Sequence, residues 1–317
     1  MTDKGSKFYY SRLSDGEKNI YDKMCGALLR FEPALSLHAG MGKAFTVNTK
    51  KIIEAVLFDN PVFFYVNRNR IVIKQTPMYI QFNFQYTHEK EEAEQLWTQV
   101  EEKIAKFIQY NIKPDMSPLA KQIAIHRHMG LISASNPPYD KEDFSVIGAL
   151  IRGRCVCEGY AKAYKLFCDR LGIASIVVLG DGIKPDGTKE PHAWNITRIN
   201  GVTAHVDACW DAQFGVSSYD YFNLCDADIA ADHSFDPDVY PKCEPNTINY
   251  FYKNGLIASD EEQLDEILAR VGNKPYYSVK LLFPYSPEKL QHLTLGIGEK
   301  RYNAAQNIIH FVHAMIE

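Results

Sequence analysis

The sequence predicts an α+β protein, because it combines amphipathic helices, an alternating strand and a tight hairpin. Apolar residues recur at helical spacing over 14–31 and again over about 90–109. Residues 79–86 alternate apolar with polar side chains, which is typical of a strand with one buried face. The dipeptide Asn200-Gly201, with strand-like residues on both sides, predicts a two-residue turn between antiparallel strands.

The composition indicates a soluble, globular chain. Of its 317 residues, 46% are hydrophobic and 23% are charged, and the net charge of -4 gives no broad basic surface for nucleic acid. No apolar run approaches the roughly 18 residues of a membrane helix, and the first dozen residues lack the apolar core of a signal peptide. We therefore expect a cytoplasmic protein without a membrane span; the alternative, an extracellular location, requires that a leader has been removed. The odd number of cysteines, 7, favours free thiols in a reducing compartment.

Local sequence signals predict the helices and strands of the N-terminal part of the chain. Ser14 and Glu17 have the spacing of a capping box and set the start of the first helix. Short strands are predicted next, over residues 62–66, 71–75 and 79–86. Ser117-Pro118 combines an N-cap with a proline at the first helical position, which predicts a helix to about Met129.

The proline-rich stretch 237–245 predicts a boundary before the C-terminal part of the chain. Beyond it the patterns predict a helix near 260–270, a strand within 276–283 and a last helix near 302–315. The resulting division has three parts: an N-terminal α+β region at 1–115, a core at 116–245 and a C-terminal α+β extension at 246–317.

Cys157 is predicted in the first turn of a helix. Apolar side chains follow it at helical spacing, and a buried strand is predicted after the helix, over 173–180. At a helix N-terminus, unpaired backbone N–H groups and the positive end of the dipole favour a thiolate over a thiol. The same N–H groups help to hold an oxyanion. Cys157 is therefore a candidate nucleophile.

The predicted hairpin brings a histidine and a carboxylate together. With a two-residue turn, Ile199 pairs with Val202, which fixes the register of both strands. Extended to the ends of the strands, this register places five residues on one face: His192, Trp194, His205, Asp207 and Cys209. His192 and Asp207 become diagonal neighbours within side-chain reach, whereas Asn195 points away. A carboxylate in that place orients the imidazole and stabilises its charged form.

Three blocks resemble the signature blocks of the transglutaminase-like superfamily, a group of papain-related Cys-His-Asp enzymes. The blocks are VCEGYA at 156–161, HAWN at 192–195 and HVDACWD at 205–211. The flanking segments resemble bacterial members, and the similarity is specific over about 120–245. The resemblance implies an α+β, papain-like fold in which the nucleophile helix packs against an antiparallel sheet.

The same resemblance implies a role for each member of a triad. The nucleophile falls on Cys157, the base on His192 and the orienting acid on Asp207. The sequence departs from the pattern in two places. Cys155 stands where no cysteine is expected, and the glutamine that papain-type enzymes use as an oxyanion donor is missing before Cys157.

Further side chains are candidates for substrate contact or for support of the triad: Trp194, Tyr139 and His205. We expect Trp194 to shield the His–Asp pair from water and His205 to pack beside it. Trp194 and Tyr139 are weak candidates for the second oxyanion donor. A zinc site built from cysteines and His192 matches no usual spacing, so we expect no metal and no cofactor.

The residues therefore predict thiol-dependent acyl transfer or hydrolysis at amide or peptide bonds, with a protein or peptide substrate. Peptidase, deamidase and transglutaminase-like reactions all remain open at this point, and so does the oligomeric state. The alternative from another class is a transglutaminase-like binding or scaffold domain that carries out no turnover.

Overall fold

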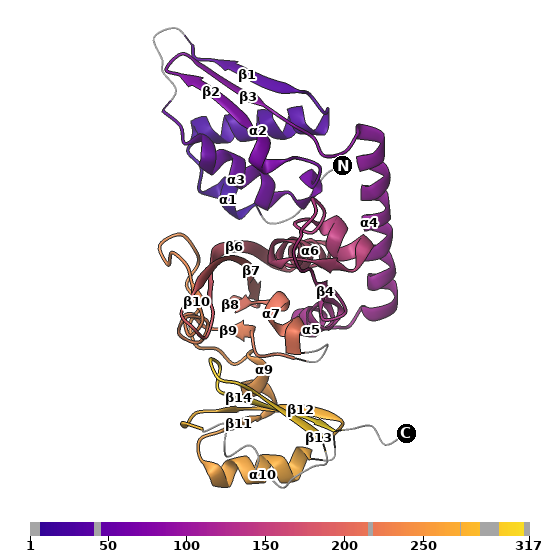
Figure 1. Ribbon diagram of the computed structural model, residues 1–317, viewed down its shortest axis with the longest axis vertical. Helices are drawn as coiled ribbons and strands as arrows, with labels where there is room; N and C mark the ends of the chain where they lie inside the picture. The colour runs from indigo at the N-terminus through magenta and orange to yellow at the C-terminus, as the bar shows by residue number, and fades with distance from the viewer. Residues whose placement is uncertain (1–6, 41–45, 215–217, 273, 286–297, 314–317) are drawn as a thin grey trace. The chain divides into compact units, whose positions relative to one another are not determined.

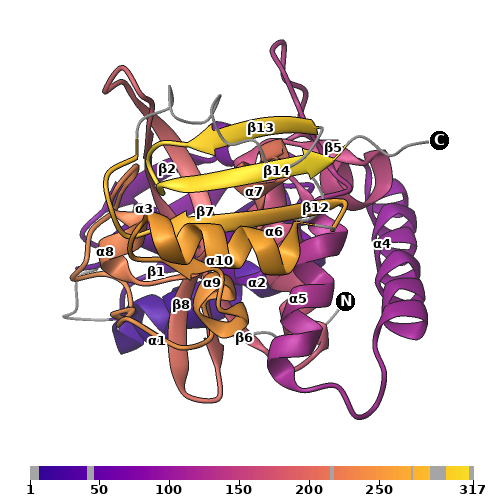
Figure 2. The same cartoon turned by 90° about the horizontal axis from the view of Figure 1, so that it is seen from below.

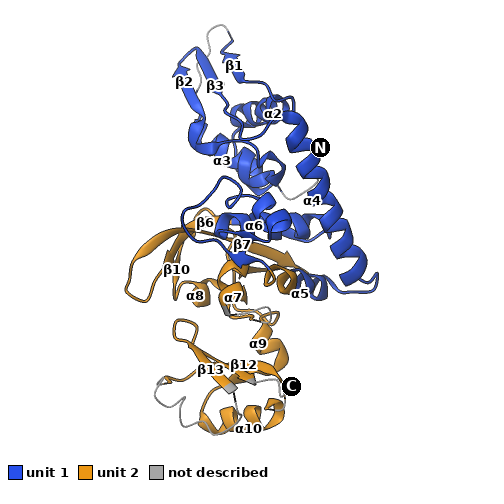
Figure 3. Ribbon diagram, turned by 45° about the vertical axis from the view of Figure 1, so that its right-hand side comes forward, with its two compact units in different colours: residues 1–125, 132–177 blue, residues 126–131, 178–317 orange. Residues whose placement is uncertain are grey.

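The computed structural model confirms the predicted α+β class, with helices and sheets along the whole course of the chain (Figure 1). It describes residues 7–40, 46–214, 218–272, 274–285 and 298–313. The chain divides into two compact units, residues 1–125 with 132–177 and residues 126–131 with 178–317 (Figure 3). The three-part division expected from the sequence stays a prediction. Among the described residues, no helix is both long enough and apolar enough to cross a membrane.

The first unit contains most of the helices. They are α1 (Phe8–Ser11), α2 (Asp15–Leu29), α3 (Thr49–Asp59), α4 (Lys90–Asn111), α6 (Cys157–Arg170) and most of α5 (Pro118–Met129). Its strands are β1 (Ala34–His38), β2 (Val72–Thr76), β3 (Tyr79–Asn83), β4 (Ser133–Ala134), β5 (Arg154–Cys155) and the start of β6 (Ala174–Ile183). A π-helical turn covers Gly148–Arg152, between β4 and β5.

The local signals of the first unit are confirmed where they are strong. The capping box opens α2: Glu17 N donates to Ser14 Oγ, and Ser14 N donates to the Glu17 carboxylate at 2.9 Å. The antiparallel sheet β1-β3-β2 buries Ile80 and Phe82 from alternate positions of β3, as the alternation predicts. The long helix α4 and the proline-started helix α5 also lie where they are predicted.

The predicted strand at 62–66 is wrong. A 3-10 helix covers Pro61–Phe63, and the following residues turn, with an isolated bridge between Val66 and Tyr86 as their sheet contact. Every side chain from 62 to 66 is buried. A short apolar run without alternation fits a buried helical turn as well as a buried strand, so periodicity could not separate the two.

The second unit contains two sheets. Its helices are α7 (Ala208–Phe214), α8 (Asp226–Ile229), α9 (Tyr250–Asn254) and α10 (Glu261–Val271). Its strands are the end of β6, β7 (Lys189–Ile199), β8 (Val202–Val206), β9 (Phe222–Leu224), β10 (His233–Ser234), β11 (Ile257–Ala258), β12 (Tyr276–Leu281), β13 (Gly298–Asn303) and β14 (Ile308–His313). The first sheet has the order β10-β6-β7-β8-β9, and the second has the order β11-β12-β14-β13.

The β7–β8 hairpin has the predicted register. Ile199 pairs with Val202, and the antiparallel ladder continues to the pair Asn195 and Val206. The turn residues have positive φ, 50° at Asn200 and 88° at Gly201. This backbone matches the twist of two flanking strands and explains why Asn-Gly is favoured there.

The C-terminal sheet packs against α10, and Figures 1 and 2 show the helix running along the strands β12, β14 and β13. The predicted helix near 302–315 is wrong, because β13 and β14 form a hairpin through this stretch; residues 314 and 315 lie outside the described residues. Asn307 has a φ of 53°, which ends a tight turn. The β-branched Ile308 and Ile309 then favour the strand, which also pairs with β12.

Candidate active site

Cys157 opens α6, as the sequence predicts. It is the first residue of this helix, and Val156 before it is extended, with ψ of 177°. Val156 N donates to the carbonyl oxygen of Asp143 at 2.9 Å, which ties the start of the helix to the 140–143 turn. Cys157 is partly exposed. The thiol is thus attached where backbone N–H groups and the helix dipole favour negative charge.

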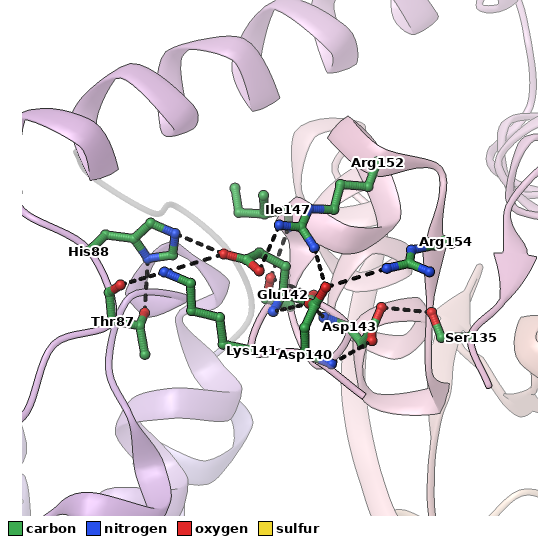
Figure 4. Close-up of polar contacts among 11 residues, drawn as sticks. Thr87, His88, Ser135, Asp140, Lys141, Glu142, Asp143, Ile147, Arg152 and Arg154 are labelled. Atoms are coloured by element: carbon green, nitrogen blue, oxygen red, sulfur yellow. Dashed lines mark hydrogen bonds and ion pairs between the residues drawn. The ribbon is translucent and has the colours of Figure 1, made fainter. Parts of the chain in front are cut away.

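The 140–143 turn, whose Asp143 carbonyl accepts the Val156 N–H, is held by hydrogen bonds of its own side chains (Figure 4). Asp143 accepts the Ser135 hydroxyl through Oδ1 at 2.7 Å and the backbone N–H of Asp140 through Oδ2 at 2.9 Å. Both contacts hold the carbonyl of Asp143 in place. The backbone leading into Cys157 is therefore positioned by a polar network rather than by an N-cap side chain.

Glu142 anchors the same turn to a more distant segment of the first unit. Figure 4 shows its carboxylate between His88 and Arg152. The distances are 3.1 Å to His88 Nε2 and 2.9 Å to Arg152 Nη2. Glu142 and His88 are both buried, and burial lowers the pKa of His88. His88 therefore meets the carboxylate as a neutral hydrogen-bonding partner, whereas Arg152 supplies the opposite charge.

Glu158 places a carboxylate directly after the candidate nucleophile. Its oxygens lie 2.6 Å from Lys162 Nζ and 3.4 Å from Arg68 Nη1. Burial alone would raise the pKa of Glu158, but the charges of Lys162 and Arg68 outweigh it and lower the pKa. The negative charge beside Cys157 is therefore paired, which limits its opposition to a thiolate.

Cys155 is a packing residue in the structure. It is fully buried, and burial raises the pKa of its thiol far above the usual range. A Cβ added to Gly159 would lie 2.6 Å from Cys155 Cβ and 2.9 Å from the Asp143 carbonyl. Glycine is thus needed where α6 passes over Cys155.

His192 and Asp207 lie together, as the hairpin register predicts. His192 belongs to β7, and its Nε2 lies 2.7 Å from Oδ2 of Asp207, which directly follows β8. Both side chains are largely buried, with 7% and 1% exposure. The imidazole of His192 also packs against the indoles of Trp194 and Trp210, at ring-centroid distances of 5.9 Å and 5.2 Å.

The extension of the β7–β8 register past Val206 is wrong. β8 ends there, and Asp207 starts α7 by accepting the backbone N–H groups of Cys209 at 2.9 Å and Trp210 at 3.2 Å through Oδ1. Cys209 therefore lies inside the helix and not on the strand face with His192. An aspartate that can cap a helix competes with strand continuation, and here the cap prevails.

Asp207 is an ionised carboxylate. Its Oδ1 accepts the two helix amides, and its Oδ2 faces His192 and also Nε2 of His233, at 3.1 Å. Burial would raise the pKa of Asp207, but the charges and hydrogen bonds of His192 and His233 outweigh it and hold the pKa well below its usual range. Asp207 thus carries a fixed negative charge next to His192.

His233 is the residue that the sequence reasoning missed. It lies in the two-residue strand β10, which pairs with Gly182 and Asp181 of β6. A single histidine in the segment DHSF has no periodicity or spacing that connects it to a hairpin more than twenty residues earlier. The resemblance of this segment to the superfamily was the available signal, but it assigned no role to His233.

The three candidates for substrate contact or triad support have different surroundings in the structure. Trp194 is buried, and its Nε1–H donates to Nδ1 of His205 at 2.9 Å, so this donor is already engaged. His205 is buried in contact with Trp194, as expected, and its Nε2 lies 2.9 Å from Asp226 Oδ1. Tyr139 belongs to the first unit, is 48% exposed and packs edge-on against Phe144.

Two groups of side chains within the described residues bring three metal-binding atoms within 4.8 Å of one another. They are His192 with Asp207 and His233, and His205 with Asp226 and Cys243. In the second group, the Trp194 N–H occupies Nδ1 of His205, so the ring proton stands on Nε2 and blocks coordination there. In the first group, the ligand atoms already face one another as donors and acceptors. We assign a metal to neither.

Comparisons with known proteins give only distant similarity. No protein-family model and no curated protein matches the chain. A solved structure from Cytophaga hutchinsonii, provisionally named a cysteine protease, matches with a TM-score of 0.29 and 10% identity over 44% of this chain and 62% of its own. A transglutaminase structure matches with a TM-score of 0.29 and 14% identity over 55% of this chain and 50% of its own. In both, the match spans less than two thirds of the solved structure, and likeness at this level carries no argument about activity.

Proposed function

We propose that the chain catalyses thiol-dependent acyl transfer at amide or peptide bonds, with Cys157 as nucleophile, His192 as base and Asp207 as orienting acid. The observation that carries the proposal is the contact of 2.7 Å between His192 Nε2 and Asp207 Oδ2. An imidazole that donates Nε2–H to a buried carboxylate exchanges its proton through Nδ1. The position of Cys157 at the start of α6 supports the assignment of the nucleophile.

In this reaction Cys157 gives its proton to His192, and the thiolate sulfur bonds to the carbonyl carbon of the substrate. The carbonyl oxygen takes up the negative charge, which backbone N–H groups at the start of α6 stabilise. His192 returns the proton to the leaving amine as the C–N bond breaks, and a thioester remains on Cys157. Water then releases a carboxylic acid, or an amine forms a new amide.

An electrophilic peptidyl probe tests the proposal without knowledge of the natural substrate. The wild-type chain should form a covalent adduct on Cys157, Cys157→Ala should form none there, and His192→Ala should label much more slowly. His310→Ala is a matched control, because His310 is also buried and paired with a carboxylate, that of Asp220. It should label at the wild-type rate.

The alternative, a binding or scaffold domain without turnover, predicts a different labelling pattern. Labelling would then be slow, spread over several cysteines and indifferent to His192. If the proposal holds, an amide-substrate screen with and without a primary amine shows whether water or the amine accepts the acyl group from Cys157. A new amide product detected by mass spectrometry indicates transfer, and release of the free acid in both conditions indicates hydrolysis.

A further inference from the structure

His233 lies between two carboxylates. Its side chain is completely buried. Nε2 faces Asp207 Oδ2 at 3.1 Å, and Nδ1 faces Asp232 Oδ1 at 2.7 Å. A neutral imidazole has one N–H group, so one of these contacts would set a nitrogen lone pair against a carboxylate oxygen. An imidazolium donates from both nitrogens and satisfies both contacts.

Neither carboxylate is placed to carry that proton itself. Asp232 Oδ2 accepts the Tyr221 hydroxyl at 2.7 Å, and its Oδ1 accepts Gln306 Nε2 at 3.4 Å in addition to His233. The two oxygens of Asp207 likewise face backbone amides and histidine nitrogens. Three of these four oxygens therefore face donors other than histidine, and the fourth, Asp207 Oδ2, faces Nε2 of both His192 and His233. This is the arrangement of two ionised carboxylates around a charged ring.

We propose that His233 is a permanently protonated positioning residue, which shares Asp207 with His192 and weakens the hold of that carboxylate on the proton of His192. Its catalytic consequence rests on the proposed function, whereas the protonation state of His233 does not. The four side chains then form an alternating series of charge: His192, Asp207, His233 and Asp232.

The short distance between the His192 and His233 rings determines how the charge on His233 changes the proton affinity of His192. The centroids of His192 and His233 lie 5.4 Å apart, so the charge on His233 disfavours a second charge on His192. The titratable groups around His233 are Asp207, Asp232, His192, Tyr221 and His205, and the last of these is held neutral. Burial by itself lowers the pKa of His233, but the hydrogen bonds to the two carboxylates raise it above its ordinary value. A proton received by His192 therefore passes more readily to a leaving amine.

Nuclear magnetic resonance of the full chain with 15N-labelled histidine tests this proposal directly. In the wild type, both ring nitrogens of His233 should carry protons from about pH 5.5 to about pH 8. In His233→Gln, the titration midpoint of His192 should rise by about 1–2 pH units, because a charge at this distance is lost. Asp232→Asn keeps the ring but removes one of its carboxylates, so the midpoint at which His233 loses its proton should fall.

The control is His310→Gln, which replaces an equally buried histidine that pairs with Asp220 instead of Asp207; the His192 midpoint should not change. An unprotonated ring nitrogen on His233 at pH 7 would overturn the proposal, and so would an unchanged His192 midpoint in His233→Gln or an unchanged His233 midpoint in Asp232→Asn. If His233→Gln does not fold, the wild-type nitrogen signals and Asp232→Asn still decide. These readouts need no substrate, so failure of Cys157 labelling would remove the proposed function and leave them unaffected.

Discussion

Trp194 donates its indole N–H to Nδ1 of His205 at 2.9 Å, and this contact decides which nitrogen of His205 carries the proton. The proton stands on Nε2, which faces Asp226. Trp194 also stacks against His192, with an interplanar angle of 22°. Trp194 thus contacts His205, which is held neutral, and His192, which is charged during the proposed reaction. It also packs edge-on against His233, at a ring-centroid distance of 4.9 Å.

The neutral state of His205 predicts a dependence of stability on pH. Burial lowers the pKa of His205 to about 4, against the opposing effect of Asp226, whereas the unfolded chain binds this proton near pH 6.5. The unfolded state therefore binds more protons between these values, and the free energy of unfolding falls as the pH drops through this window. His205 should contribute about 2 kcal/mol of that loss between pH 7 and pH 5.

Urea unfolding at both pH values checks this prediction. His205→Gln keeps an acceptor for Trp194 and a donor for Asp226 but does not titrate, so the variant should lose about 2 kcal/mol less than the wild type. Equal losses in the two proteins would show that His205 is charged in the folded state.

Asp207→Asn should reduce turnover by about 10³–10⁴-fold while the fold remains intact. The asparagine oxygen still accepts the α7 backbone amides, so the helix keeps its cap. Its NH2 group, however, faces His192 Nε2 as a donor and selects the tautomer with the proton on Nδ1, which cannot take a proton from Cys157. Asn195→Ala is the control on the same hairpin and should matter much less. A larger loss in Asn195→Ala would assign the orienting role to Asn195.

Limiting iodoacetamide at about pH 6 should modify Cys157 well before the other six thiols. All seven cysteines lie in the described residues, and Cys25 and Cys157 are partly exposed while the other five are buried. Burial raises the pKa of the Cys25 thiol to about 12, so exposure alone does not make it reactive. Peptide mapping by mass spectrometry reads out the order. Reaction at Cys155 first would move the nucleophile by two residues, and no reaction below about pH 8 would remove the enzyme assignment.

Gly159→Ala should destabilise the first unit by about 1–3 kcal/mol, because the added methyl overlaps Cys155 and the Asp143 carbonyl. The comparison is Gly16→Ala in the exposed first turn of α2, where the nearest atom to an added Cβ is 3.9 Å away. That variant should be neutral or up to about 1 kcal/mol more stable. Thermal unfolding of both variants tests the pair, and equal stabilities would contradict the close packing of α6.

The parts of the site that could be predicted depend on local signals. The start of α6 at Cys157 follows from helical spacing. The turn preference of Asn200-Gly201 fixes the hairpin register as far as Val206, and Asp207 directly follows this strand. Both signals act over a few residues, and tertiary packing supports them here. The same locality explains the success of the capping box at Ser14.

The parts that failed depend on competition or on long-range contacts. Asp207 could continue a strand or cap a helix, and the choice depends on residues that follow it. The stretch 302–315 has apolar residues that fit a helix, but within the described residues Ile308–His313 form the strand β14, which pairs with β12. His233 reaches Asp207 through the fold alone, across 26 positions of sequence, so no local pattern could reveal it.

The turn between β13 and β14 makes the last part of the chain inseparable from the region before it. Asn303 Nδ2 donates to Asp220 Oδ2 at 2.8 Å, and Gln306 Nε2 donates to the backbone carbonyl of Asp228 at 3.1 Å. A chain cut at residue 245 would remove the Asn303 donor from the Asp220 carboxylate and the Gln306 donor from the Asp228 backbone carbonyl, at a penalty of about 1–3 kcal/mol for each group left buried. Expression of the first 245 residues alone should therefore give an aggregating product, and a designer who grafts this thiol site onto another scaffold must transfer the C-terminal hairpin with it.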